Sequence, residues 1–286
     1  IQKVTFNGCS SLTDVSIPSS VTIIDISAFA GCSSLSQISI PESVTRIENS
    51  AFRGCSSLKQ LIIPSAVEFI GGCAFNGCSS LEQINIPSSI KTIENLTFCG
   101  CKSLKDILIP TSITSIGNFA FGKCEKLNKI VIPSSVKSIG SSLLNGCSSL
   151  TEVKIPSALR KIPYETFANC TSLKEINLSS NVTEIVDSAF AFCASLERIN
   201  IPLSVNKIGA HAFEGCKLLK VMNIQSPIDS INNYLFSQCA SLEQITIPSS
   251  VKVIGKYSFS ICETLKQITI PSSVTKIDDY AFEHCT

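Results

Sequence analysis

Cysteine recurs at an interval of 23 residues along the whole chain of 286 residues, and the interval never slips. Only Cys73 and Cys99 lie outside this column. An interval this regular indicates a chain built from copies of one structural unit, because each copy places the same residue in the same environment. The cysteines of the column are Cys9, Cys32, Cys55, Cys78, Cys101, Cys124, Cys147, Cys170, Cys193, Cys216, Cys239, Cys262 and Cys285.

Other apolar residues keep the same period. Phenylalanine lies three residues before each cysteine of the column, with Leu144 as the only substitute, and the leucine at Leu12 and the isoleucine at Ile24 recur without exception. One unit reads L-x-x-I-x-I-P-x-x-V-x-x-I-x-x-x-A-F-x-G-C-x-S. Self-similarity at 20 to 29 residues is the signature of a solenoid, in which a unit buries its apolar face only against its neighbours. The sequence therefore predicts about twelve stacked turns of 23 residues.

The first part of each unit has the pattern of a short strand. Leu12, Val15 and Ile17 lie at nearly alternating positions and would point inward. Pro18 follows at once, and proline belongs at a strand end because it donates no ladder hydrogen bond. Equivalent strands of successive turns would stack into one long parallel β-sheet on one face of the solenoid.

The second part of each unit supplies the opposite face. Val21 and Ile24 send another apolar pair inward, which predicts a short second strand. The segment 28–32, of sequence Ala-Phe-Ala-Gly-Cys, is typical of a single helical turn that ends at a left-handed glycine, Gly31. The expected fold is thus a solenoid with short second strands and single helical turns opposite the main sheet.

The unit resembles the leucine-rich repeats of the BspA-like family, also called the Treponema pallidum type, and the resemblance covers all 286 residues. It implies a leucine-rich-repeat solenoid. It also implies a non-catalytic protein-binding module at the cell surface or secreted, with adhesion to host, matrix or microbial proteins. The alternative is an intracellular, cytoplasmic scaffold or structural rod, which the thiol-rich column and the absence of a signal sequence in the chain favour.

Composition and motifs argue against several other classes. A formal net charge of +1 gives no field that would attract nucleic acid, and no apolar run reaches the roughly 18 residues of a membrane span, so neither nucleic-acid binding nor membrane insertion is expected. Apart from the adjacent Gly71 and Gly72, glycines occur singly, and no glycine lies in a complete phosphate-binding loop of the form G-x-x-x-x-G-K-[ST]. No serine or cysteine is set beside a histidine and an acid, so we expect no enzyme and no cofactor.

The cysteines leave several alternatives open. The thirteen of the column would be buried free thiols or, in a secreted protein, a disulfide framework. Cys73 and Cys99 fall in adjacent turns and could form one disulfide or a metal site. No metal is expected otherwise, because His211 and His284 lie three turns apart.

Recognition is expected at the outward positions of the first strand, since these positions are free of packing demands. Ile62, Leu108 and Val131 are apolar there and would form a sticky stripe for a protein or glycoprotein ligand. The alternative is that they only stabilise neighbouring strands. The candidate ligand-binding residues are Gln60, Ile62, Gln83, Asn85, Asp106, Leu108, Lys129 and Val131.

The two ends of the chain both fall inside a repeat. Ile1 is equivalent to Ile24, and the chain stops just after Cys285, so no polar cap is seen at either end. Because solenoids normally need caps, we expect residues 1–286 to be a single solenoid domain within a longer protein, or to associate end to end.

Overall fold

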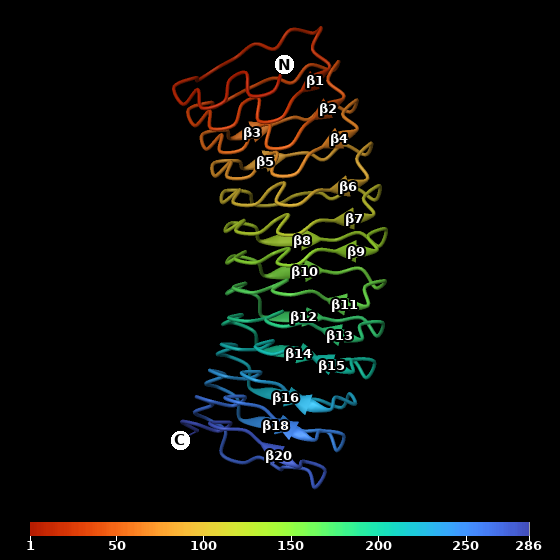
Figure 1. Cartoon of the computed structure of the whole chain (residues 1–286), viewed down its shortest axis with the longest axis vertical. Coiled ribbons are helices and arrows are strands. Elements are labelled where there is room, and N and C mark those ends of the chain that lie inside the picture. The colour runs from red at the N-terminus through yellow and green to blue at the C-terminus, as the bar shows by residue number, and fades with distance from the viewer. Residues whose placement is uncertain (286) are drawn as a thin grey trace. The chain divides into compact units, whose positions relative to one another are not determined.

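The computed structural model describes residues 1–285 as a β-solenoid whose turns repeat every 23 residues. It comprises two compact units, Ile1–Leu150 and Thr151–Thr286. In each unit the chain coils so that two columns of very short strands run from turn to turn (Figure 1). Each strand has only two or three residues, because the period allows a few extended residues between one corner and the next. The solenoid predicted from the repeat is confirmed.

The second strand column follows the V-x-x-I part of each unit and forms parallel pairs in strict register. Ile24 lies opposite Ile47 in the first unit, and Ile185 lies opposite Ile208 in the second. Each isoleucine is the residue that the pattern predicted to point inward. The strands are β1 (Ile23–Ile24), β2 (Arg46–Ile47), β4 (Phe69–Ile70), β6 (Thr92–Ile93), β7 (Ser115–Ile116) and β9 (Ser138–Ile139) in the first unit, and β11 (Lys161–Ile162), β13 (Glu184–Ile185), β15 (Lys207–Ile208), β17 (Ser230–Ile231), β19 (Val253–Ile254) and β20 (Lys276–Ile277) in the second.

The first strand column, which follows each invariant leucine, is less continuous than the sequence suggests. The expected single sheet is divided into small sheets, such as β3 with β5 and β12 with β14. Strands this short share few hydrogen bonds, and a proline follows most of them and removes a further donor, although Ser179 and Gln225 take its place after β12 and β16. The strands are β3 (Gln60–Leu61), β5 (Gln83–Ile84) and β8 (Lys129–Val131) in the first unit, and β10 (Glu152–Lys154), β12 (Glu175–Asn177), β14 (Arg198–Asn200), β16 (Val221–Asn223) and β18 (Gln244–Thr246) in the second.

The corner opposite the first column differs from the expected helical turn, and no helix occurs among residues 1–285. Gly31 is left-handed as predicted, with φ +75°. Ser27 is left-handed as well, with φ +53°, and a residue in this conformation interrupts a right-handed helix. The backbone N–H groups of this corner therefore donate partly to the next turn and partly within their own turn. The Phe29 N–H donates to the Ala51 carbonyl of the next turn at 2.8 Å, whereas the Cys32 N–H donates back to Phe29 at 3.2 Å.

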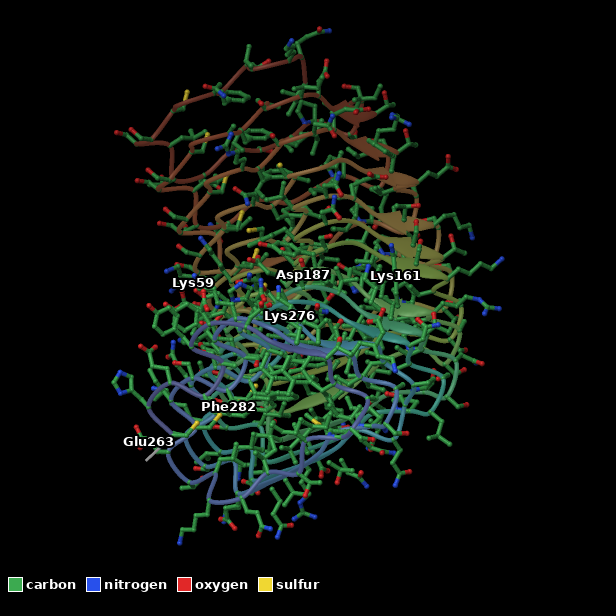
Figure 2. All side chains as sticks on the ribbon, turned by 60° about the horizontal axis from the view of Figure 1, so that its bottom comes forward. Lys59, Lys161, Asp187, Glu263, Lys276 and Phe282 are labelled. Carbon is green, nitrogen blue, oxygen red and sulfur yellow. The ribbon has the colours of Figure 1, made fainter. Side chains whose placement is uncertain are left out.

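The core consists of the repeated apolar residues, which fill the inside of each coil (Figure 2). The phenylalanine rings stack face to face from turn to turn. The centroids of Phe29 and Phe52 are 5.3 Å apart with planes 5° from parallel, and those of Phe190 and Phe213 are 5.5 Å apart. Leu144 takes the place of one ring and is fully buried. Every turn thus buries one side of its neighbour, as the period requires.

The cysteine column lies beside the phenylalanines, and all fifteen cysteines are free thiols. Eleven column thiols, those of Cys32 to Cys147 and of Cys193 to Cys285, are placed like Cys55, whose Sγ donates a hydrogen bond to the Phe29 carbonyl of the turn before, at 3.2 Å. Burial raises the pKa of Cys55, Cys147 and Cys193 from the ordinary 9.0 to about 12. The buried thiols of the column therefore pack and satisfy backbone carbonyls, and these buried thiols stay protonated at neutral pH.

These environments predict a sharp division in thiol reactivity. With Ellman's reagent at about pH 8 we expect rapid labelling of Cys9, which is exposed, and of Cys73 and Cys285, which are half-buried, because reaction needs an accessible thiolate. Buried thiols should react only after unfolding in guanidinium, where all fifteen become countable by absorbance. A Cys9→Ser variant should show one fewer rapidly labelled thiol per chain. Fast labelling of most thiols in the folded chain would contradict the buried column.

A second set of contacts between turns pairs asparagine or aspartate with glycine 22 residues later. The Asn95 Oδ1 accepts a hydrogen bond from the Asn118 N–H of the next turn at 2.7 Å. A Cβ added to Gly117 would lie 2.6 Å from both the amide nitrogen and Oδ1 of Asn95. Glycine is therefore required wherever the preceding turn carries such a side chain. The pairs are Asn49 with Gly71, Asn95 with Gly117, Asn118 with Gly140, Asp187 with Gly209 and Asn233 with Gly255.

Candidate ligand-binding face

The eight candidate residues lie in four successive turns of the first unit, at the outward positions of the first strand column; we call these positions the first face. Gln60 pairs with Gln83 across β3 and β5. Asp106 and Leu108 belong to an extended segment outside any assigned strand, and Lys129 and Val131 bound β8. All eight are exposed, as the alternation predicted.

The three apolar candidates are open to solvent to an unusual degree. Ile62 is 80% exposed, Leu108 is 84% exposed and Val131 is 43% exposed. Leu61 and Ile107, which directly precede Ile62 and Leu108 in the chain, are buried. Inward and outward side chains therefore alternate as in a strand. Apolar side chains that leave the core this completely contribute nothing to the packing inside the solenoid and are available to a partner.

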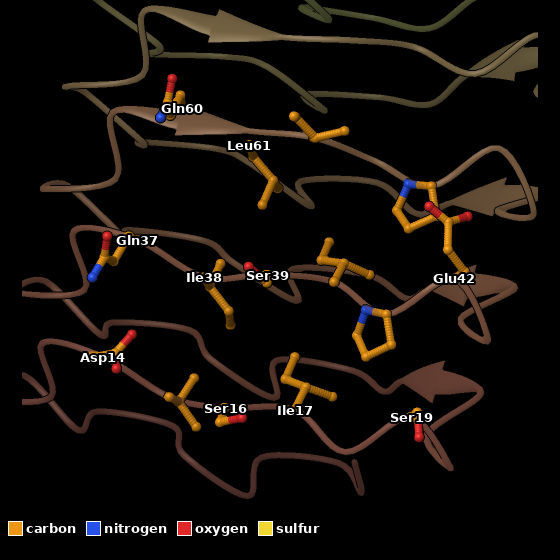
Figure 3. A pocket seen from close by; sticks show the side chains of 15 residues that line it. Asp14, Ser16, Ile17, Ser19, Gln37, Ile38, Ser39, Glu42, Gln60 and Leu61 are labelled. Carbon is orange, nitrogen blue, oxygen red and sulfur yellow. The ribbon is translucent and has the colours of Figure 1, made fainter.

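A groove of about 740 Å³ crosses the first face over the first three turns (Figure 3). Gln60 and Ile62 belong to its lining, and the remaining six candidates do not. Asp14, Gln37 and Gln60 follow one another along one edge of the groove, one residue per turn, as Figure 3 shows. The groove was not anticipated from the sequence, because residues of three successive turns line it together.

Asn85 differs from the other candidates because its side chain is bound to the backbone. Its Oδ1 accepts a hydrogen bond from the Ile63 N–H at 2.7 Å, and its Nδ2 donates to the Ile63 carbonyl at 2.9 Å. The amide thus replaces the ladder bonds that β3 and β5 lack beyond Leu61 and Ile84. Asn85 therefore links two neighbouring turns of the first face.

An ion pair borders the candidate residues. The Lys105 Nζ lies 3.1 Å from the Glu82 Oε2 in the preceding turn. The hydrogen bond from Lys105 holds the pKa of Glu82 below its ordinary value, so this carboxylate stays ionised near neutral pH. Both side chains are about half exposed, so the pair adds little stability and instead provides a charged rim beside the apolar residues.

Within residues 1–285 no group of three or more His, Cys, Asp or Glu side chains is placed to hold a metal ion. In the same part of the chain no helix is long and apolar enough to cross a membrane. His211, far from the face in sequence, points its Nδ1 at the Glu214 Oε2 at 2.7 Å.

The structure also contains an aromatic ladder that the sequence reasoning missed. His211 stacks on Tyr234 with centroids 4.6 Å apart, and Tyr234, Tyr257 and Tyr280 continue at 5.0 and 4.9 Å. All four residues are left-handed, at the position that Ser27 occupies in an early turn. The 23-residue spacing of these four residues was a signal in the sequence. It was missed because the equivalent positions of the earlier turns hold residues of many types.

The turns, columns and exposed face together define a leucine-rich-repeat solenoid. The sequence matches the BspA type leucine-rich repeat region over residues 1–110, 91–220 and 185–286. The chain belongs to this family, as the repeat unit indicated.

Solved structures of bacterial proteins share the fold. A leucine-rich repeat protein from Bacteroides ovatus is 28% identical over 96% of this chain and 87% of its own, with a TM-score of 0.67. A leucine rich cell surface protein from Faecalibacterium prausnitzii is 29% identical over 84% of this chain and 61% of its own, with a TM-score of 0.53. No curated protein matches the chain.

Proposed function

We propose that the chain is a non-catalytic protein-binding module displayed at the cell surface, which adheres to host, matrix or microbial proteins through the first face of the first unit. The observation that carries the proposal is the exposure of Ile62, Leu108 and Val131 at outward strand positions. The resemblance to a bacterial cell surface protein supports the location. The protein or glycoprotein ligand would supply apolar side chains opposite these three.

Burial of the three apolar side chains against a ligand would stabilise the complex. Removing an exposed isoleucine or leucine side chain from water contributes roughly 1.5 to 3 kcal/mol, so three such residues can anchor an interface. The polar neighbours Gln60, Gln83 and Asp106 and the ion pair of Glu82 with Lys105 would form the rim that confers specificity. The groove over the first three turns extends the contact area from Ile62 toward the start of the chain.

Replacing Ile62, Leu108 and Val131 together with serine is expected to weaken ligand capture at least tenfold while leaving the melting temperature nearly unchanged, because none of the three packs inside the solenoid. The whole chain would be immobilised and exposed to purified matrix proteins and to a cell-surface protein extract, and bound proteins would be quantified by mass spectrometry.

The matched control replaces three exposed apolar residues outside the first strand column, namely Ile23, Leu203 and Leu218, with serine. This variant loses as many apolar side chains and should capture ligand as the parent does. Equal capture by the parent and by the Ile62, Leu108 and Val131 variant would refute the assignment of the face.

A further inference from the structure

The first strand column of the second unit presents a ladder of uncharged polar side chains, which we call the amide ladder. It consists of Asn177, Asn200, Asn223, Thr246 and Thr269, each exposed and each 23 residues from the last. The register is strict where strands pair, since Asn177 lies opposite Asn200 and Asn223 lies opposite Thr246. In the second unit Lys154 precedes the ladder at the equivalent position. In the first unit Ile62, Leu108 and Val131 hold three of the equivalent positions, and Ser16, Ser39 and Asn85 hold the other three.

The amides of this ladder take no part in holding the fold together. Elsewhere asparagine side chains bond the backbone of an adjacent turn, as Asn85, Asn118 and Asn233 do. Across the described chain no side-chain hydrogen bond involves Asn177, Asn200 or Asn223. Their donors and acceptors face solvent, and the fold does not require amides at these positions.

A groove of about 590 Å³ runs along the end of the ladder, over the last turns of the unit. Gln244 and Gln267 line it beside Thr246 and Thr269, and their amides are likewise unbonded among the described residues. Glu243 and Lys266 contribute one charge of each sign. The lining therefore combines many neutral hydrogen-bonding groups with no net charge. Val221 also lines the groove and exposes apolar surface to it.

We infer that the amide ladder and its groove bind an uncharged polysaccharide. Each side-chain amide carries two hydrogen-bond donors and two acceptor lone pairs. A partner that excluded water from this face without bonding these groups would lose roughly 1 to 3 kcal/mol of binding free energy per group. A glycan presents hydroxyl groups, which donate and accept at once, and its contacts tolerate bridging water. A protein interface core would instead need several apolar or aromatic residues, whereas Val221 is the single large exposed hydrophobic residue of strands β12, β14, β16 and β18.

The spacing of the ladder suits a linear chain. Successive amides are separated by the distance between neighbouring strands, about 4.8 Å, which is close to the advance of one pyranose unit in an extended glycan. A polysaccharide lying along the solenoid would meet one amide or hydroxyl per sugar. The exposed side of Val221 would contact the C–H face of a ring.

Affinity electrophoresis tests this inference with the whole chain. Native gels would contain mannan, galactomannan, laminarin or hydroxyethyl cellulose as uncharged probes, and heparin or dextran sulfate as anionic ones. We expect at least one uncharged polysaccharide to retard the protein. Replacing Asn177, Asn200 and Asn223 with alanine should reduce that retardation at least tenfold in apparent affinity, with the melting temperature unchanged.

Two controls isolate the site. Asn206→Ala removes an exposed amide that directly precedes β15 of the second strand column, and this variant should bind as the parent does. The serine variant of Ile62, Leu108 and Val131 should also bind as the parent does. If the alanine variant does not fold, a variant with valine at the three positions replaces it, since Val131 occupies the same place in β8. Retardation by no uncharged probe, retardation by anionic probes alone, or undiminished retardation of the triple variant would each overturn the inference.

Discussion

Replacing Phe190 with alanine is expected to lower the free energy of unfolding by about 3 to 5 kcal/mol. The Phe190 ring is fully buried and lies between two others, 5.2 Å from that of Phe167 and 5.5 Å from that of Phe213. Its removal leaves a cavity between two turns, and the short strands on either side are held by the same inter-turn hydrogen bonds and cannot close it freely. Urea denaturation followed by circular dichroism would measure the change.

Phe190→Leu is the matched variant. Leucine occupies the equivalent position at Leu144 and is fully buried there, so the fold accepts its shape. We expect this change to cost less than about 1.5 kcal/mol, since the core remains filled. If alanine and leucine destabilise the chain equally, the ring stack is not what holds these turns together.

Replacing Gly117 with alanine is expected to cost about 2 to 3 kcal/mol, although the position is not left-handed. The new methyl group would lie 2.6 Å from the amide nitrogen of Asn95 and 2.8 Å from the carbonyl carbon of Glu94. Backbone atoms cannot yield as a flexible side chain can, so the two turns must move apart. Thermal unfolding monitored by calorimetry would report the loss.

Gly72→Ala is the control, because a Cβ there would meet its nearest atom, the Asn95 carbonyl oxygen, at 3.2 Å, which a small shift relieves. We expect its effect to stay within about 0.5 kcal/mol. Combining Gly117→Ala with Asn95→Gly should cost less than the two single changes summed, since the turn that follows Gly72 carries Glu94 at the position of Gly117. Strict additivity would mean that the pairing of asparagine with glycine is coincidental.

Most of the core could be predicted from the sequence because its period is simple. A residue that recurs every 23 positions meets its own equivalents in a solenoid, so the invariant leucine, isoleucine, phenylalanine and cysteine had to be buried. The alternation around Leu61 and Ile62 likewise predicted which side chains point outward. The eight candidate residues therefore lie on one exposed face of the first unit, as expected from their positions alone.

Details that depend on distances between turns could not be predicted. The left-handed residue at Ser27 and its equivalents carries no glycine signal, and it replaces the expected helical turn with bonds between turns. The pairing of Asn95 with Gly117 joins residues of different turns, and the interruption of the first sheet follows from strands too short to share many bonds.

The sequence by itself determined the period, the inward residues and the family, because each follows from local spacing. The tertiary structure decided which outward side chains remain free. Asn85 is bound to the backbone of Ile63, whereas Asn200, at the same position of a later turn, is unbonded among the described residues. Two asparagines that are equivalent in the repeat differ in this way because the hydrogen bonds open to each depend on how the adjacent turn is paired.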